Sequence, residues 1–559
     1  MLRPQGQGRR IATCCPAWTI DCMSRTRTFL PLIATMGLSL SPQLAGAQTV
    51  EQIEPAALLV VTGSAQVVPE QRAAPQQDAA PPQNIPPQPS TPPAEAVTPR
   101  APSSPATFTY PAHADGFGIK LGGYNASRWA EDWRGMRNPG KRDDPLDRLK
   151  YLPIDADGIA YVTLSGEIRL REQYVSQPGL LPGDHRREQL LRVFAGADVH
   201  VGPLRAFGEL AHGGLAGYNI GAPAAKSRND LFAQQYFVEL SGSIARGLAG
   251  GVRYGRQEFS DGAPGLISVK DDNSIHTELN GGRAWLSFAQ FRADIFDFKQ
   301  TMLGMGGSGD DRIDHATRFS GVTFGVVLAN SAKRKVFFDP FFWRERNDML
   351  KWGKVSGLEL RHYYGARLWG STGRLTFDWL VNHQDGEYRD RPIDAWFLQA
   401  AQTYALSGKG LKPKPGIHFD YGSGGGAYGT GTIRNTRTIT AGSIAYSYQL
   451  VLNLTNLFQV SPNFTISPSK SLDLTAEVQH SLRVDESDAV YRGAGTAYAG
   501  TQLVRGAHVG DAARLQATWK VTPRVSVIGR YEYFEPGAVL KAVGSKASHF
   551  LAGWVSLRF

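Results

Sequence analysis

Arginine and acidic residues recur at every second position along several segments of this chain. In the first such segment, Glu167, Arg169 and Arg171 alternate with Ile168 and Leu170. A guanidinium group can bind a carboxylate through two parallel hydrogen bonds, whereas a lysine ammonium acts as a point charge. A polar face that is rich in arginine and tempered by acids is expected to attract a polyanion and still release it. By the same parity, this face includes Arg192, Arg361, Arg514, Arg530 and Asp198.

The alternation predicts β-strands, because successive side chains of a strand point to opposite faces. It recurs in residues 191–201, 374–382, 472–483 and 514–521. A soluble sandwich and a membrane barrel would both show it, but the connections discriminate between them. Short connections such as 202–203 alternate with long ones rich in Gly, Asp and Asn, as in an outer-membrane barrel. The long connections lie near 216–229, 260–281, 301–315, 424–440, 484–510 and 535–547.

The predicted strands have about 10–13 residues, which is enough to span a membrane when tilted. We therefore predict an all-β protein, a transmembrane antiparallel β-barrel over residues 143–559 with about 18 strands. The chain ends on an alternating strand with Val555, Leu557 and Phe559 on its apolar face. This strand is expected to pair with the first and close the barrel. Its terminal aromatic residue resembles the signal that the outer-membrane assembly machinery reads.

The first 142 residues have a different composition. Residues 1–47 are predicted to be a signal peptide region, with the true start at Met23, a basic and then an apolar stretch, and cleavage after Ala47. All cysteines precede Met23, so the mature chain has neither disulfides nor thiol chemistry. Residues 48–142 are largely Pro/Ala/Gln-rich, cannot bury enough apolar area to order themselves, and are expected to form a disordered periplasmic segment.

Charge and motifs narrow the function classes. The formal charge is +10, and removing residues 1–47 takes away five Arg and one Asp, which leaves +6. An exported basic protein is expected to meet anions rather than nucleic acid. Neither G-x-S-x-G nor H-E-x-x-H occurs, so we expect no enzyme, no cofactor and no metal site. The acid pairs Asp271-Asp272 and Asp310-Asp311 are read as solvated loop charges rather than calcium ligands.

Several stretches resemble the alginate export family of outer-membrane porins. They are DDPLDRLKYLPI at 143–154, DLFAQQYFVEL at 230–240 and VRYGRQEFSDGAPGLISVKDDNSIHTELNGGRAW at 252–285. The resemblance covers residues 143–559. It implies an 18-stranded monomeric barrel whose arginine-lined constriction passes a polyuronate outward. Arg256 falls on the outward parity and would need a bulge to reach the pore. The residues that the resemblance carries over to the lumen are Arg169, Arg171, Arg192, Arg253, Arg256, Gln257 and Arg283.

Three functions in the outer membrane of a Gram-negative bacterium follow from these observations. The first is passive diffusion or export of an anionic polysaccharide through an arginine-lined lumen. The second is a general or anion-selective porin that takes up small anions or sugar acids. The third is a structural barrel whose N-terminal tail binds the envelope or a periplasmic secretion or scaffold partner. In all three the partners include membrane lipid, and the inward arginines can also pair with acids only to stiffen the wall.

Overall fold

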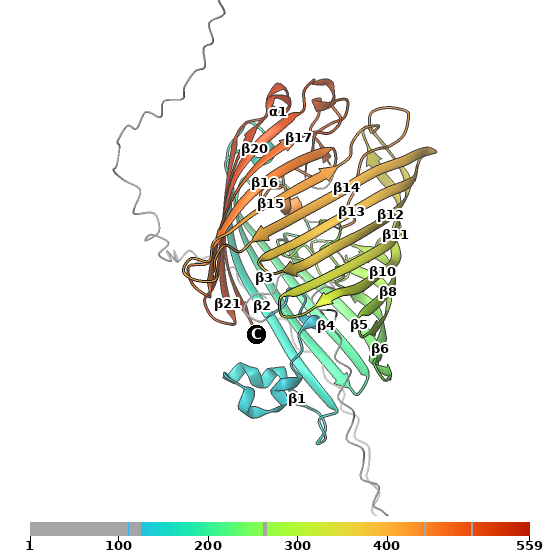
Figure 1. The fold of residues 1–559 in the computed structure, drawn as a ribbon, viewed down its shortest axis with the longest axis vertical. Helices are drawn as coiled ribbons and strands as arrows, with labels where there is room; N and C mark the ends of the chain where they lie inside the picture. The colour runs from blue at the N-terminus through green and yellow to red at the C-terminus, as the bar shows by residue number, and fades with distance from the viewer. Residues whose placement is uncertain (1–109, 111–123, 261–264, 441–442, 493–495) are drawn as a thin grey trace, which may run out of the picture. The chain divides into compact units, whose positions relative to one another are not determined.

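The computed structural model describes Tyr110 and residues 124–559, except 261–264, 441–442 and 493–495. The expected signal peptide and most of the Pro-rich segment lie outside the described residues. In the described part, eighteen antiparallel strands form one closed barrel, as predicted (Figure 1). These strands are β2 (Ala160–Val175), β3 (Arg186–Val201), β4 (Leu204–Tyr218), β5 (Asn229–Ala245), β6 (Leu248–Gln257), β7 (Leu279–Phe288), β8 (Phe291–Met302), β10 (Thr317–Asn330), β11 (Arg334–Trp352), β12 (Val355–Thr372), β13 (Leu375–Tyr388), β14 (Arg391–Tyr404), β15 (Lys414–Gly422), β16 (Leu457–Ile466), β17 (Leu472–Leu482), β20 (His508–Lys520), β21 (Val525–Pro536) and β22 (Ser548–Arg558).

The barrel closes where its first long strand meets its last. β2 pairs with β22 in antiparallel register, with Glu167 opposite Arg558. Phe559 continues this ladder, since its N–H donates to the carbonyl oxygen of Gly166 (3.1 Å) and its own carbonyl accepts from the Gly166 N–H (3.0 Å). The terminal residue thus completes the seam, and no unpaired strand edge remains there.

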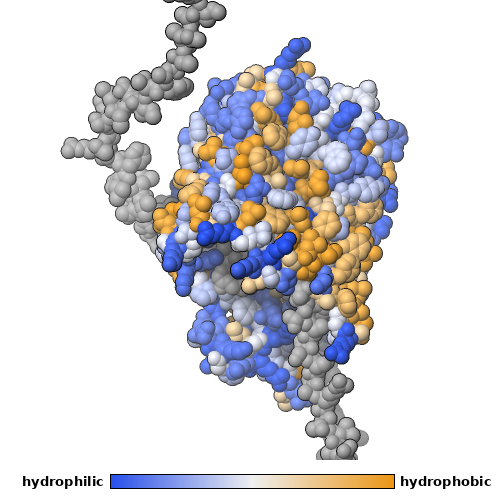
Figure 2. All heavy atoms as spheres, viewed as in Figure 1, coloured by the Kyte–Doolittle hydropathy of each residue, from blue (hydrophilic) through white to orange (hydrophobic). Residues whose placement is uncertain are grey.

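The outer face of the barrel is apolar. Ile168 and Leu170 of β2 are exposed (47% and 62%), whereas Arg169 and Arg171 between them are buried. Leu551, Val555 and Leu557 are likewise exposed on β22. Figure 2 shows hydrophobic residues spread over this surface, with hydrophilic ones gathered toward both ends. Such a face requires lipid as its partner, because exposing apolar side chains to water costs free energy. None of the helices in the described ranges is both long and apolar enough to cross a membrane.

Short and long connections segregate to opposite ends of the barrel. The end that includes Phe559 carries only turns such as 202–203, the longest being 405–413. The opposite end carries the longest connections, 258–278, 423–456 and 483–507. Two strand pairs depart from the predicted alternation, because Gly353-Lys354 and Arg389-Asp390 form two-residue turns at the long-connection end. We refer to the two ends as the inner (short) and outer (long) ends.

Part of the barrel interior is a hydrophobic core. Phe296, Phe319 and Trp343 point inward from β8, β10 and β11, and all are buried. Leu266 and Leu454, from the connections 258–278 and 423–456, belong to the same cluster. In this part of the wall the inward positions therefore face a packed apolar core rather than an arginine-lined lumen. The connections fold into the lumen and cover the aromatic side chains, and this burial gains about 25 cal/mol per Å² of apolar surface.

Short helices lie just before the barrel: η2 (Arg128–Ala130), η3 (Arg134–Arg137), η4 (Pro139–Lys141) and η5 (Pro145–Lys150). η5 begins after Asp144, whose side chain accepts a hydrogen bond from the Leu146 N–H (2.6 Å), with Pro145 at the first helical position. The sequence assigned residues 124–142 to the segment without structure, but this part contains η2–η4. The aromatic and charged residues that follow the proline-rich stretch allow it to pack. The remaining elements are η6 (Pro178–Leu180), η7 (Ser443–Ala445), η9 (Thr501–Leu503), α1 (Ala538–Ala542), β1 (Leu152–Pro153), β9 (Arg312–Ile313), β18 (Tyr491–Arg492) and β19 (Thr496–Ala497).

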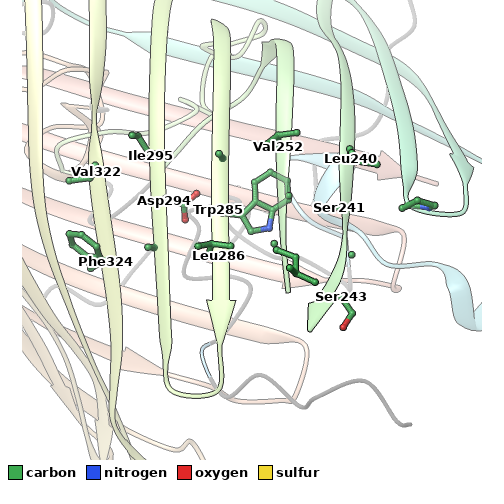
Figure 3. Close-up of a pocket in the computed structure, with 17 residues that line it drawn as sticks. Leu240, Ser241, Ser243, Val252, Trp285, Leu286, Asp294, Ile295, Val322 and Phe324 are labelled. Carbon is green, nitrogen blue, oxygen red and sulfur yellow. The ribbon is translucent and has the colours of Figure 1, made fainter. Parts of the chain in front are cut away.

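A shallow hollow of about 540 Å³ lies on the wall formed by β5–β8 and β10 (Figure 3). The exposed side chains of Leu240, Val252 and Ile295 line it, together with Gly242 and Gly250. Because the lining is apolar and outward-facing, the hollow belongs to the membrane surface rather than to the lumen.

Candidate channel lumen

The connection 258–278 is held inside the barrel by arginines of the first two long strands. Arg169 donates to the carbonyl oxygens of Asp271 (2.6 Å) and Asn273 (2.6 Å). Arg192 also donates to the Asp271 carbonyl (2.9 Å), and Arg171 donates to that of Asp272 (3.1 Å). The three guanidinium groups therefore bind backbone of this connection rather than line an open pore.

Acidic side chains and a histidine complete this buried network. Glu167 and Asp271 both accept from Arg192 (2.7 and 2.8 Å). His276 lies between two carboxylates, 2.6 Å from Glu258 and 3.0 Å from Asp271. Burial removes these charges from water, so each one needs the partners that it has. The network fixes the connection at one position in the lumen.

The segment 124–151 contacts the same network from the inner end. Arg128 is buried between Glu167 and Glu209. Ser127 donates to Glu258 (2.5 Å), and the guanidinium carbon of Arg253 lies 3.8 Å from the centre of the Trp129 ring. These contacts insert η2 into the barrel and narrow its inner mouth.

A second connection, 423–456, enters the lumen from the outer end. Arg437 forms two hydrogen bonds with Glu345 of β11 (2.5 and 2.8 Å). Arg361 donates to the Asn435 carbonyl oxygen (3.0 Å), and Arg514 donates to the Ala445 carbonyl oxygen (2.8 Å). Arginines of two strands that are not adjacent, β12 and β20, thus hold this connection, just as Arg169, Arg171 and Arg192 hold 258–278.

The remaining predicted residues lie inside the wall, mostly in pairs between strands. Arg253 bonds Glu239, and Arg283 bonds Asp294 at 2.6 Å. Asp198 pairs with Arg205 at 2.6 Å. Arg530 joins the first network through Asp272 (2.8 Å), while Gln257 donates to the Gly281 carbonyl oxygen (3.2 Å).

Arg256 departs from the predicted inward set. β6 and β7 pair without a register shift through this residue, so there is no bulge at Arg256. Its guanidinium donates to Asn280 (3.1 Å) and to the Ala233 carbonyl oxygen (3.0 Å). Arg256 is buried, but by neighbouring groups of the wall and not by the network around Arg192.

A cavity of about 1570 Å³ remains between the inserted connections and the wall. Its charged lining is mostly basic, because only Asp271 and Asp272 oppose the cations, and both already bind arginines behind them. Trp352, Tyr428 and Tyr491 add aromatic surface. The cations of the lining are Arg186, Lys226, Lys270, Lys351, Lys354, Arg367, Arg437 and Arg492.

Several of these cations have no carboxylate partner among the residues that the structure describes. They are Lys226, Lys270, Lys351, Lys354 and Arg492. Burial, together with the neighbouring charge of Lys226, lowers the pKa of Lys270 to about 8. Because burial disfavours the charged form of this lysine, a bound anion would stabilise it by supplying the negative partner that it lacks. Strand parity could not find these residues, because most of them lie on connections; the only signal was basic residues within the long connections.

The fold and this lumen define an outer-membrane channel. The closed barrel presents apolar residues to lipid and keeps many charged residues inside, such as Arg192 and Arg361, around a cavity. Such a barrel spans the outer membrane of a Gram-negative bacterium. A family model described as alginate export matches residues 160–553, and the chain belongs to that family. No curated protein matches the chain.

Similar solved structures come from two bacteria. OccAB1 of Acinetobacter baumannii is 11% identical, with a TM-score of 0.49, over 74% of this chain and 99% of that chain. OccK2 (OpdF) of Pseudomonas aeruginosa, in complex with glucuronate, is 11% identical, with a TM-score of 0.47, over 71% and 98%. OpdK of Pseudomonas aeruginosa, with vanillate, is 11% identical, with a TM-score of 0.46, over 71% and 98%.

Proposed function

We propose that this channel passes an anionic polysaccharide, an alginate-like polyuronate, by passive diffusion. The observation that carries the proposal is the cavity whose lysines and Arg492 lack carboxylate partners in the described residues. A polyuronate has one carboxylate per sugar. Cations placed at intervals along a path bind such a chain at several weak sites, and weak sites allow it to leave.

The extent of the cavity supports a path rather than a single site. Its lining includes Lys354, just before the outer end of β12, and Arg367, near the inner end of the same strand. At about 3.3 Å per residue and a tilt of about 40°, these positions are roughly 33 Å apart along the barrel axis. That length is close to the hydrocarbon thickness of about 30 Å.

The aromatic and the cationic residues would bind different parts of the substrate. Lysines and Arg492 attract the carboxylates, while Trp352, Tyr428 and Tyr491 offer flat apolar faces to the sugar rings. The strand arginines position the connections that shape the path. In this account, Arg169, Arg171 and Arg192 act on the substrate mainly through the connection 258–278.

Block of the ion current tests the substrate class. The refolded full-length chain would be placed in a planar bilayer, and polymannuronate or neutral dextran of matched length would be added. We expect polymannuronate to block the current in a concentration-dependent manner and dextran to leave it unchanged. Equal block by both polymers, or none by either, would reject a polyuronate channel.

Uptake of small anions or sugar acids is the second candidate. It is favoured by the inserted segments, because η2 and the connections 258–278 and 423–456 occupy part of the lumen and leave a bounded cavity of about 1570 Å³. Block by oligouronates of increasing length separates the two functions. A small-solute porin responds to mono- and disaccharides only, whereas a polymer channel responds more strongly as the chain grows.

A further inference from the structure

Two histidines and an aspartate lie close together on the outward face of the barrel wall and take no part in the lumen network. His480 lies two residues before the end of β17, and His508 and Asp511 lie at the start of β20. All three are at least partly exposed, with side-chain exposures of 53%, 39% and 47%. β17 and β20 are adjacent strands, and Figure 1 labels both toward the outer end.

Strand register explains why the three side chains meet. His480 is directly opposite Asp511, and His508 is opposite Leu482, on the same face as His480. His480 Nδ1 lies 2.6 Å from one carboxylate oxygen of Asp511, and His508 Nε2 lies 3.0 Å from the other. The two imidazole rings stack, with centroids 5.2 Å apart and planes 22° apart.

This arrangement matches the ligands of a late first-row metal ion. One ligand atom from each residue lies within 4.8 Å of the others. Around a tetrahedral ion with bonds of about 2.0–2.1 Å, ligand atoms are roughly 3.3 Å apart, so small side-chain rotations suffice. Two imidazoles and a carboxylate suit Zn²⁺, Ni²⁺ or Cu²⁺, whereas Ca²⁺ and Mg²⁺ prefer oxygen ligands alone.

Other outward histidines provide an internal comparison. His362 pairs with Asp385, and His383 pairs with Asp394, each at 2.9 Å. Each of these pairs offers one nitrogen and one carboxylate, which is a ligand too few. Over the described residues, His480, His508 and Asp511 form the one group of three that meets the distance requirement. Parity along one strand does not show which residue of the next strand lies beside His480, so the group becomes visible only with the strand register.

We propose that His480, His508 and Asp511 bind one Zn²⁺ or a similar divalent transition-metal ion at the outer rim of the barrel. The ion replaces the hydrogen bonds that now link Asp511 to the two imidazoles. It leaves at least one coordination position open to the surroundings. By joining β17 to β20 it also fixes the strand ends from which the connection 483–507 departs.

The test is a Zn²⁺ titration of the refolded full-length chain, followed by calorimetry and by metal analysis after gel filtration. We expect one ion per chain. H508A and H480A should each weaken binding at least about tenfold. H362A, which removes a histidine of a two-ligand pair, should bind like the wild type.

A second readout keeps the test independent of folding. Cu²⁺ bound to the wild type should give an electron paramagnetic resonance spectrum with two coupled nitrogens, and H508A should reduce these to one. Circular dichroism and heat-modifiable migration would confirm that each variant forms the barrel. Absence of stoichiometric binding, or binding that H480A and H508A leave unchanged, would overturn the proposal.

Discussion

Arginines and lysines have different tasks inside this barrel. The arginines of the strands are buried and bonded to backbone carbonyls or carboxylates, as Arg192 is to Asp271 and Glu167. Lys226 and Lys270 lie on connections and line the cavity without carboxylate partners in the described ranges. Guanidinium groups satisfy several acceptors at once, which suits them to hold a connection, whereas an ammonium group remains available to a mobile anion.

The first prediction concerns the cavity lysines. The double variant K226Q/K270Q should lower the affinity for a uronate about tenfold, because two positive charges leave the binding surface. K333Q, in the turn between β10 and β11 at the inner end, is the control and should behave like the wild type. Current block at several uronate concentrations measures the affinity. Equal affinity in the double variant would remove these lysines from the path.

The second prediction is a pH dependence. The pKa of Lys270 is lowered to about 8. Lys270 is charged below that value, so uronate affinity should be constant below about pH 7 and fall as the pH rises through 8. Binding should also take up a proton near pH 8, which calorimetry in two buffers can measure. The dependence should be absent from K270Q; its persistence there would assign it to another group.

The third prediction concerns Arg192. In R192A, Glu167 and Asp271 lose their shared partner, and breaking a buried pair costs about 3–5 kcal/mol. We expect the connection 258–278 to open locally, with hydrogen exchange at Asp271–Asn273 faster by at least two orders of magnitude. Single-channel conductance should then fluctuate. Unchanged exchange would mean that Arg192 does not hold the connection.

At the scale of elements, segment 124–151 is bonded to the inner end of the barrel through several ion pairs. Arg128 inserts between Glu167 and Glu209, and Arg524 bonds Asp144 (2.6 Å) and Asp147 at the barrel end. Desolvation by burial lowers the pKa of Lys150 to about 8, partly offset by Glu131. The segment is thus held by charge pairs, which changes in pH and salt can weaken.

The fourth prediction follows from Arg128. R128A should release η2 and raise the mean conductance severalfold, because Glu167 and Glu209 lose the cation that lies between them and ties η2 to the wall. R134A is the control: Arg134 bonds only Asp132 at an exposed position. Limited proteolysis after Arg137 reports release of the segment. A conductance in R128A equal to that of R134A would show that η2 does not obstruct the mouth.

Lys150 should make the docking of segment 124–151 depend on pH, in a direction that its pKa defines. Its pKa is about 8 when docked and 10.5 ordinarily, so a released segment binds a proton that the docked one lacks between these values. Docking should therefore strengthen as the pH rises from 8 to 9.5. The trend should vanish in K150M, as measured by the protease concentration that cleaves half of the segment. An identical trend in K150M would exclude Lys150 as its cause.

At the scale of the whole molecule, the sequence predicted the barrel well and the lumen poorly. Side chains alternate between lipid and lumen along each strand, and this alternation is visible in the local sequence. The strand faces and the number of strands can therefore be predicted; Ile168 and Leu170, for example, lie on the outward face as expected. The insertion of 258–278 and 423–456 depends on contacts between distant parts of the chain, such as Arg514 with Ala445. No local pattern encodes these contacts. Aromatic residues such as Phe319 and Trp343 on the inward face are therefore explained only once the connections that pack against them are known.

The fifth prediction concerns closure of the barrel. Removing Phe559 deletes both hydrogen bonds to Gly166 and ends the seam one residue early. We expect slower assembly and less folded barrel in outer-membrane fractions, measured by heat-modifiable migration. F559L retains the backbone bonds and serves as the control. If F559L assembles as poorly as the deletion, the aromatic ring matters more than the seam.

The permeability ratio of chloride to potassium tests the central claim most directly. It is obtained from the reversal potential of the wild-type channel in a planar bilayer under a tenfold KCl gradient. The basic cavity predicts a ratio well above one that falls toward one in K226Q/K270Q and remains high in K333Q. A cation-selective channel, or a ratio near one that none of these variants changes, would contradict an anion path through the lumen.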